Sequence, residues 1–563
     1  MARQVILPAI STRKRSSSKG FFSERRIFGG RRKKGDKYSL DSGRKSAMYD
    51  LVFRNARILD GTGAPWYKGD VAIKDGRIAK VGMVEGKGRE EVDCAGNYLC
   101  PGFIDAHSHS DQALVTTPTC DSKVMQGVTL EIIGQCGASA APRGMGPDDG
   151  DEEGDETFKP SWTDMASYLD LLETNGISVN VAALVGHGSV RRQVMGSAMR
   201  APTADEMNLM KRLVAQAMDQ GAWGISTGLI YVPGVYAETE EIIELAKVAA
   251  SRGGVYFTHM RNEGPNLLEA IEEALRIGRE ADVPVQISHF KAAGKANWGK
   301  VTEAIEIIER ARRSGLDVTA DQYPYIASST GLGAFLPSWV WEGGREAALR
   351  RMRDPVERGR IIEAISGRDF WSDLVIANVS SVFDAQFVGK SVADIAGFLG
   401  VSPEEACLGL LERNMGVVQI VNFAMSEDDV KTVMRQPWVM VGSDARALKK
   451  ETAKGQPHPR SYGTFARILG KYVREEKTLR LEEAVRKMTS LPAMRLGLQD
   501  RGLVREGMWA DLVLFNADEI ADVATYTDPH HYAKGILQVL VNGVTVVKDG
   551  RHTGRRPGRV LRR

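Results

Sequence analysis

Two histidines spaced two residues apart end an apolar segment early in the chain. His107 and His109 follow Phe103 and Ile104, and the two-residue period of a β-strand places both imidazoles on one face. Buried imidazoles need polar partners, so such a pair is suited to holding a cation. By itself, the pair fits two ordinary buried histidines equally well.

Four further side chains with metal-binding chemistry follow other apolar segments. They are Cys136 after residues 129–133, His259 after residues 255–258, His289 after residues 285–288 and Asp444 after residues 438–443. Imidazole, thiolate and carboxylate are ligands that zinc prefers, and four or five of them permit one metal ion or a close pair. The alternative for Cys136 is a small, buried, apolar side chain. A metal beside the Asp444 carboxylate predicts hydrolysis, because the metal acidifies water and the carboxylate can take its proton.

Alternating strands and helices would bring these residues together. Thr203 and Glu206 form a capping-box pattern that opens a helix, and Thr239 is the predicted cap of the next helix. The unit recurs about every thirty residues, which favours a closed (β/α)8 barrel of the TIM type, whose active sites lie at the carboxyl ends of the strands. Predicted strands are 103–106, 129–133, 179–185, 222–226, 255–258, 285–288, 316–320 and 438–442, and predicted helices include 204–219, 267–278 and 301–313.

Both ends of this barrel region are flanked by short β-runs and turns. Residues 49–100 and 501–550 are predicted to form one small β-sandwich domain from both chain ends, with a hairpin turn at Asn542-Gly543. The barrel then spans residues 101–500. A stretch at about 327–367 lacks the barrel rhythm and is predicted to be an insertion over the barrel mouth. The acidic run 148–156 is predicted to be a solvated loop.

Charge is distributed unevenly along the chain. The formal net charge is +3, but residues 1–48 alone hold fourteen Lys or Arg against three Asp or Glu. This basic, Ser-rich extension is predicted to be disordered, and Met48 is an alternative start of the chain. Residues 551–563 are predicted to be a basic tail. Basic tails are common, so no nucleic-acid partner is expected.

The composition is that of a water-soluble globular protein. The chain has 43% hydrophobic and 26% charged residues, and no apolar run is long enough to cross a bilayer, so no membrane association is expected. The five cysteines at positions 94, 100, 120, 136 and 407 lack the spacing of a disulfide framework. That usage favours a reducing compartment, and a cytoplasmic location is expected.

Six short segments of the chain form recognisable motifs: PGFIDAHSH at 101–109, GQCG at 134–137, STGLIYVPGVY at 226–236, THMR at 258–261, SHFK at 288–291 and GSD at 442–444. Together they resemble the N-acyl-D-amino-acid deacylases, or D-aminoacylases, of the amidohydrolase superfamily. The resemblance runs from about residue 49 to residue 550. A cysteine after the second strand is characteristic of this branch, whereas many relatives use a carboxylated lysine on the fourth strand.

The resemblance implies a role for each matching residue. It implies one zinc held tightly by Cys136, His259 and His289, and a weaker second metal position at His107, His109 and Asp444, with Asp444 as the catalytic acid and base. It also implies that Arg261, Lys291, Tyr323 and Arg460 bind the substrate carboxylate, with help from Ser328 or Ser329. Arginine and lysine suit that task through bidentate and point-charge contacts.

One departure concerns the residue after the predicted base. The family commonly has Ser-Asp-Gly, whereas this chain has Ser443-Asp444-Ala445. Alanine lacks the conformational freedom of glycine at positive φ, so we expect a different loop path and a changed position of Arg460.

The predicted activity is zinc-dependent hydrolysis of an N-acyl-D-amino acid to a carboxylate and a D-amino acid. The expected partner is therefore a small molecule, and the sequence predicts no oligomeric state. One alternative is a cyclic amidase that resembles dihydroorotase or hydantoinase, for which a carboxylated lysine near the fourth strand is expected. A second alternative is a catalytically silent barrel that serves as a scaffold, which would bind no zinc.

Overall fold

The computed structural model describes residues 48–143 and 160–563. The expectations for the basic extension before Met48 and for the acidic run 148–156 lie outside these residues. Among the described residues, no helix combines the length and the apolarity that a membrane span requires.

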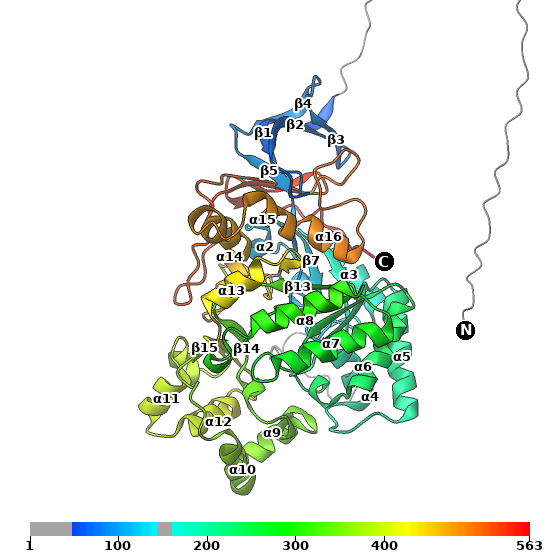
Figure 1. The fold of residues 1–563 in the computed structure, drawn as a ribbon. Helices are drawn as coiled ribbons and strands as arrows, with labels where there is room; N and C mark the ends of the chain where they lie inside the picture. The colour runs from blue at the N-terminus through cyan, green and yellow to red at the C-terminus, as the bar shows by residue number, and fades with distance from the viewer. Residues whose placement is uncertain (1–47, 144–159) are drawn as a thin grey trace, which may run out of the picture. The chain divides into compact units, whose positions relative to one another are not determined.

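A parallel β-barrel forms the centre of the fold (Figure 1). Its strands are β6 (Phe103–Asp105), β7 (Val128–Ile133), β8 (Asn180–Ala183), β9 (Val185–Gly186), β10 (Gly224–Gly228), β11 (Val255–His259), β12 (Val285–Ile287), β13 (Val318–Gln322) and β17 (Val439–Val441). They pair in the orders β6-β7-β8 and β9-β10-β11-β12-β13-β17. Only Leu184 separates β8 from β9, and the Trp223 amide just before β10 donates to the Ala183 carbonyl of β8 at 2.8 Å, so we count β8 and β9 as one barrel strand. The Ala106 amide donates to the Val441 carbonyl at 3.2 Å and so links β6 to β17. The predicted (β/α)8 fold is confirmed.

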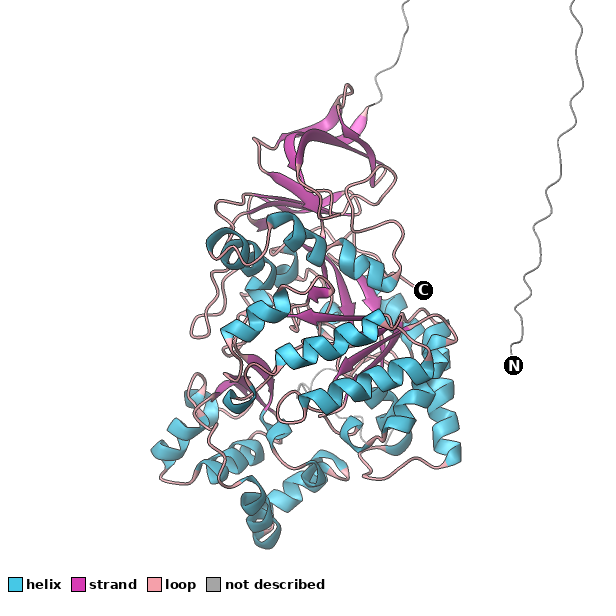
Figure 2. Ribbon diagram, viewed as in Figure 1, coloured by secondary structure: helices cyan, strands magenta, loops and turns pink. Residues whose placement is uncertain are grey.

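Helices lie between the strands along the chain and cover the barrel (Figure 2). They include α3 (Met165–Asn175), α4 (His187–Met195), α5 (Ala204–Asp219), α6 (Thr239–Ala250), α7 (Leu267–Ala281), α8 (Val301–Arg313), α13 (Glu427–Met434), α14 (Arg460–Arg467), α15 (Leu481–Met488) and α16 (Ser490–Leu496), while α1 (Ala113–Thr116) and α2 (Asp121–Val124) are single turns. Thr203 and Glu206 form the predicted capping box of α5. The predicted cap at Thr239 is wrong, because the Thr239 hydroxyl donates to Glu273 at 2.8 Å and Glu238 occupies the cap position.

Strands from both ends of the described chain share one nine-stranded sheet. They are β1 (Tyr49–Ile58), β2 (Tyr67–Lys74), β3 (Arg77–Gly82), β4 (Gly88–Asp93), β5 (Tyr98–Pro101), β18 (Leu512–Phe515), β19 (Ile536–Val541), β20 (Val544–Lys548) and β21 (Arg551–His552). Antiparallel pairing of β5 with β18 joins the two ends. Phe53, Leu99 and Leu512 meet in its apolar core. Asn542 and Gly543 connect β19 to β20 with φ values of 51° and 79°, as the predicted hairpin turn requires.

The segment between β13 and β17 has a hydrophobic core of its own. It contains the antiparallel sheet β14-β16-β15, made of β14 (Ser328–Gly331), β16 (Val418–Asn422) and β15 (Leu374–Val379). Helices α9 (Gly344–Arg353), α10 (Pro355–Ile365), α11 (Val392–Leu399) and α12 (Pro403–Arg413) accompany it. Leu349, Ile376 and Ile420 belong to one buried cluster. This unit therefore extends about fifty residues beyond the stretch 327–367 that lacked barrel rhythm, because β15 and β16 complete the sheet that β14 begins.

Candidate active site

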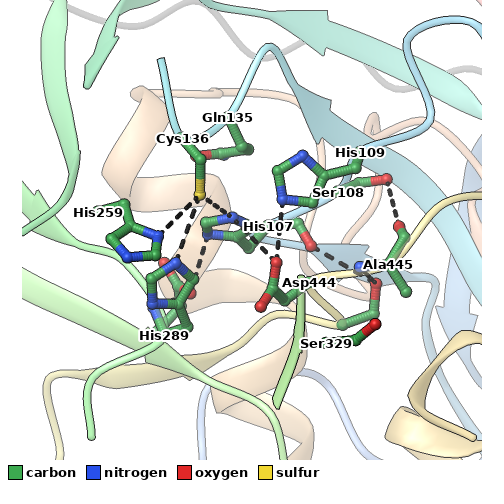
Figure 3. A network of polar contacts seen from close by, with 12 residues as sticks. His107, Ser108, His109, Gln135, Cys136, His259, His289, Ser329, Asp444 and Ala445 are labelled. Atoms are coloured by element: carbon green, nitrogen blue, oxygen red, sulfur yellow. Dashed lines mark hydrogen bonds and ion pairs between the residues drawn. The ribbon is translucent and has the colours of Figure 1, made fainter. Parts of the chain in front are cut away.

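Side chains from five barrel strands converge where those strands end (Figure 3). Cys136 Sγ lies 3.4 Å from His107 Nε2, 3.6 Å from His259 Nδ1 and 3.4 Å from His289 Nε2. Asp444 Oδ1 lies 2.9 Å from His109 Nε2 and 3.6 Å from His107 Nε2. The structure therefore brings all six predicted ligand residues into one cluster.

The spacing of these donor atoms fits a metal ion. With zinc–sulfur and zinc–nitrogen bonds of ordinary length, a tetrahedral site separates sulfur from nitrogen by about 3.5 Å. The three distances from Cys136 Sγ to imidazole nitrogens are 3.4, 3.6 and 3.4 Å. Ligand atoms of His107, Cys136, His289 and Asp444 also lie within 4.8 Å of one another. Both the donor types and the distances make these residues a candidate metal-ligand cluster.

The electrostatic environment favours the metal-binding forms of Cys136 and Asp444. Burial raises the pKa of the Cys136 thiol, but the charges of His107 and His289 outweigh it and hold that pKa well below its usual value. The pKa of Asp444 is likewise held well below its usual value, because the charges of Arg460 and His289 outweigh the effect of burial. A thiolate and a carboxylate are the forms that ligate a metal.

Three of the cluster residues have a left-handed backbone. Cys136, His289 and Asp444 have φ values of 52°, 35° and 51°, a region that L-residues other than glycine seldom occupy and that is enriched at functional sites. Ala445 is not among the residues with positive φ. The left-handed turn falls on Asp444, a residue type that tolerates it, so the backbone at Ala445 does not require a glycine. The expected change in the loop path and in the position of Arg460 stays a prediction.

The loop after β6 sets the orientation of His107 and His109. Because β6 ends at Asp105, the strand pleat does not set the directions of His107 and His109. Their ring centroids nevertheless lie 5.2 Å apart. The Asp444 amide donates to the His107 carbonyl at 2.8 Å and the His109 amide donates to the Ala445 carbonyl at 3.2 Å. Backbone pairing between these two loops thus positions both imidazoles beside Asp444.

Three of the four predicted substrate-binding residues line a cavity of about 640 Å³ beside the cluster. That volume lies within the roughly 300–1,000 Å³ range of small-molecule sites. Arg460 donates to Asp444 at 2.7 Å and its guanidinium lies 4.6 Å from the centre of the Tyr323 ring. Lys291 Nζ lies 5.7 Å from the same ring centre. Ser328 and Ser329 also line this cavity.

Arg261 does not line the cavity. Its guanidinium donates to the Glu273 carboxylate at 2.8 Å, to the Ala237 carbonyl at 2.9 Å and to the Val235 carbonyl at 3.2 Å. Because β11 ends at His259, the chain turns before Arg261 and directs its side chain toward α7. The structure places Arg261 as a brace between α7 and the segment after β10.

Glu263 is a site residue that the sequence reasoning missed. Its carboxylate lies 2.8 Å from His289 Nδ1, 2.5 Å from Lys291 Nζ and 3.6 Å from His259 Nε2. The charge of Lys291 holds the pKa of Glu263 far below its usual value, against the effect of burial. A carboxylate behind a ligating imidazole orients the ring and raises its basicity. The only sequence signal was a glutamate four residues after His259.

A buried ionic network lies beneath the His107 and Asp444 loops. Lys123 Nζ lies 2.7 Å from Asp105 and 3.3 Å from Glu131, and all three side chains are buried. The same ammonium donates to the Ser443 hydroxyl and to the Ala445 carbonyl, both at 2.8 Å. The network therefore ties β6, β7 and the Asp444 loop together.

Two other buried histidines make polar contacts outside the cluster. His458 Nε2 lies 2.9 Å from the Ala327 carbonyl, and its Nδ1 accepts the Arg460 amide at 3.0 Å. His187 Nε2 lies 2.8 Å from the buried carboxylate of Glu241. Neither belongs to the ligand cluster in the part of the chain that the structure describes.

An eight-stranded parallel barrel that gathers imidazoles, a thiolate and a carboxylate at the carboxyl ends of its strands defines a metal-dependent barrel hydrolase. A family model described as "Amidohydrolase family" matches residues 90–547. N-acyl-D-glutamate deacylase of Alcaligenes xylosoxydans xylosoxydans is 38% identical over 515 residues, which cover 91% of this chain and 96% of that protein. D-aminoacylase of the same organism is 37% identical over 524 residues, which cover 92% and 98%.

A solved structure has the same fold. The crystal structure of N-acyl-D-glutamate deacylase from Bordetella bronchiseptica, complexed with zinc and a phosphonate mimic of the tetrahedral intermediate, matches with a TM-score of 0.79 at 36% identity. The match covers 92% of this chain and 100% of that chain. This chain belongs to the amidohydrolase family, and within it to the N-acyl-D-amino-acid deacylases.

Proposed function

We propose that this protein hydrolyses the amide bond of N-acyl-D-amino acids with the help of zinc, releasing a carboxylate and a D-amino acid. The observation that carries the proposal is the placement of Cys136 Sγ at 3.4–3.6 Å from three imidazole nitrogens, beside the Asp444 carboxylate. The relatives named above, deacylases of N-acyl-D-amino acids, support the choice of a linear amide substrate.

Zinc would be held by Cys136, His259 and His289, and a second, weaker metal position would use His107, His109 and Asp444. When bound, zinc supplies Lewis-acid polarisation of the acyl carbonyl and makes a water more acidic. Asp444 would take the proton of that water and deliver it to the leaving amine, as a general base and then a general acid.

The cationic residues of the cavity would orient the substrate. Arg460 and Lys291 would bind the α-carboxylate, with the Tyr323 hydroxyl as a further donor. Arg460 lies 2.7 Å from Asp444 and Lys291 lies 2.5 Å from Glu263. A carboxylate bound by both cations would therefore lie close to the ligand cluster, with the neighbouring amide bond beside it.

The cyclic amidase alternative has less support. That branch would carry a carboxylated lysine near the fourth barrel strand, but β10 (Gly224–Gly228) contains no lysine.

The five cysteines, which are all buried and free of disulfides, favour a cytoplasmic location.

The test is hydrolysis of a panel of paired N-acetyl-D- and N-acetyl-L-amino acids by the purified protein with added zinc. We expect turnover of the D-series, loss of activity after treatment with a chelator, and recovery when zinc is restored. Metal content measured in parallel should rise and fall with activity. Turnover that is confined to cyclic amides would contradict the proposal, and a protein that binds no zinc and hydrolyses nothing would support the scaffold alternative.

A further inference from the structure

The cavity contains a cationic side chain that the proposed reaction does not use. Lys454 lines the same cavity as Asp444, His259 and His289, and its side chain is exposed. The two acidic residues that line this cavity are each already paired with another cation. Asp444 lies 2.7 Å from Arg460 and Glu263 lies 2.5 Å from Lys291. Within the described residues, Lys454 takes part in no ion pair.

Two carboxamides lie near Lys454 in the cavity wall. Asn378 of β15 and Gln419 of β16 are direct partners across the antiparallel sheet, so their side chains lie on one face. That face borders the cavity, because both residues line it. Both side chains are half-buried. Within residues 48–143 and 160–563, neither carboxamide makes a side-chain hydrogen bond, so their donors are available to a ligand.

The backbone holds the Lys454 segment against this sheet. The Gln456 amide donates to the Ala377 carbonyl at 2.7 Å. Gly455 has a φ of 71°, and a Cβ there would clash with the Ala377 carbonyl oxygen and lie 2.9 Å from the Asn378 side-chain oxygen. Gly455 thus permits a close approach of the segment to β15. These contacts hold Gly455, the residue that follows Lys454, against Ala377 and Asn378, while the side chain of Lys454 is exposed.

We propose that Lys454, Asn378 and Gln419 bind a second carboxylate of the substrate, one that is separate from the α-carboxylate. An ammonium group with two carboxamide donors has the chemistry to bind an anion and offers nothing to an apolar group. The inference rests on the proposed deacylase function and narrows it to dicarboxylic substrates. The second carboxylate could belong to the amino-acid side chain or to the acyl group.

The experiment compares charged substrates with uncharged isosteres under added zinc. N-acetyl-D-glutamate against N-acetyl-D-glutamine tests the side chain, and N-succinyl-D-leucine against its terminal amide tests the acyl group. We expect the wild-type kcat/KM to favour the charged member of one pair by about tenfold, since a hydrogen-bonded charge typically contributes that much. The pair that shows the preference identifies where the carboxylate lies.

Variants test whether Lys454 and Asn378 cause the preference for the charged substrate. Lys454→Met should reduce the charged-to-uncharged ratio of kcat/KM about five- to tenfold, and Asn378→Asp should reduce it through repulsion of a carboxylate. Lys449→Met is the matched control, because Lys449 is an exposed lysine of the same segment that does not line the cavity. It should leave the ratio unchanged.

The outcomes separate this inference from the proposed function. Turnover without a charge preference in either pair would overturn the inference alone. A preference that persists in Lys454→Met would also overturn it. Absence of turnover for every substrate, N-acetyl-D-leucine included, would contradict the proposed function, and the inference would fail with it.

Discussion

The left-handed backbone at Cys136, His289 and Asp444 sets the directions of three side chains in the ligand cluster. Such a conformation costs of order 1–3 kcal/mol for each residue other than glycine. Surrounding contacts must therefore hold it, and the Asp444 amide bonded to the His107 carbonyl at 2.8 Å is one of them. At the scale of residues, this hydrogen bond stabilises the loop that contains Asp444 and keeps its carboxylate beside the imidazoles.

Asp444→Asn tests the role of that carboxylate. An asparagine keeps the size of the side chain and loses the proton-accepting charge, so zinc content should stay near that of the wild type. We expect kcat to fall about 10²- to 10⁴-fold, the usual contribution of a general acid and base. Elemental analysis and steady-state kinetics on the same preparation measure both quantities.

Ala445→Gly is the matched control for Asp444→Asn. Because the positive φ falls on Asp444 and not on Ala445, restoring the glycine that is common in the family should change turnover little. An Asp444→Asn protein that retains wild-type turnover at full zinc occupancy would refute the assignment of the catalytic acid and base.

Loops and strands are joined beneath the site by the buried Lys123 network. The Lys123 ammonium contacts Asp105 of β6 at 2.7 Å and Glu131 of β7 at 3.3 Å, and it reaches the Asp444 loop through Ser443 at 2.8 Å. The two carboxylates raise the pKa of Lys123 above its usual value in spite of burial. At the scale of elements, one ammonium group connects parts of the chain that carry candidate ligands.

Lys123→Met should destabilise the protein strongly. Removing one partner of a buried ion pair leaves uncompensated charge, which typically costs about 3–5 kcal/mol. We expect a lower Tm by calorimetry and weaker zinc binding in a competition assay with a chelator. Lys80→Met removes a surface pair with Glu506, in which both side chains are about half exposed, and should cost at most about 1 kcal/mol. Equal Tm values for the two variants would argue against the network.

At the scale of the whole molecule, the C-terminal segment contacts both the nine-stranded sheet and the barrel. Strands β1–β5 and β18–β21 share one sheet, and the segment after β21 returns to the barrel. Val560 forms a bridge with Val181, and the Leu561 amide donates to the Val181 carbonyl at 2.7 Å. The Trp223 indole also donates to the Leu561 carbonyl at 2.6 Å. The residues predicted as a basic tail thus pack against barrel strand β8.

Deletion of residues 557–563 should therefore lower the Tm and leave kcat almost unchanged. The loss of buried Val560 and half-buried Leu561 should cost about 2–4 kcal/mol, seen as a lower Tm. The kcat at low temperature should change little, because the ligand cluster contains none of these residues. Arg562→Ala with Arg563→Ala is the control, since it removes terminal charge and keeps Val560. A truncated protein with a wild-type Tm would show that this contact is dispensable.

Pattern and residue type were sufficient to predict the barrel and the side chains that meet at its rim. His107, Cys136 and Asp444 each follow an apolar strand, and parallel strands in a barrel end at one rim, so their chemistry could be inferred without coordinates. The resemblance to the D-aminoacylases added the candidate residues Lys291 and Arg460 that line the cavity.

Contacts between residues distant along the chain decided the features that the sequence did not predict. Glu263 and Lys123 acquire their roles from contacts with residues distant along the chain, and Arg261 faces α7 because the chain turns after His259. Periodicity reports only which face of an element is buried, whereas loop paths depend on all the contacts that hold them. The sequence by itself determined which atoms could bind a metal, and the tertiary structure decided which charges surround them.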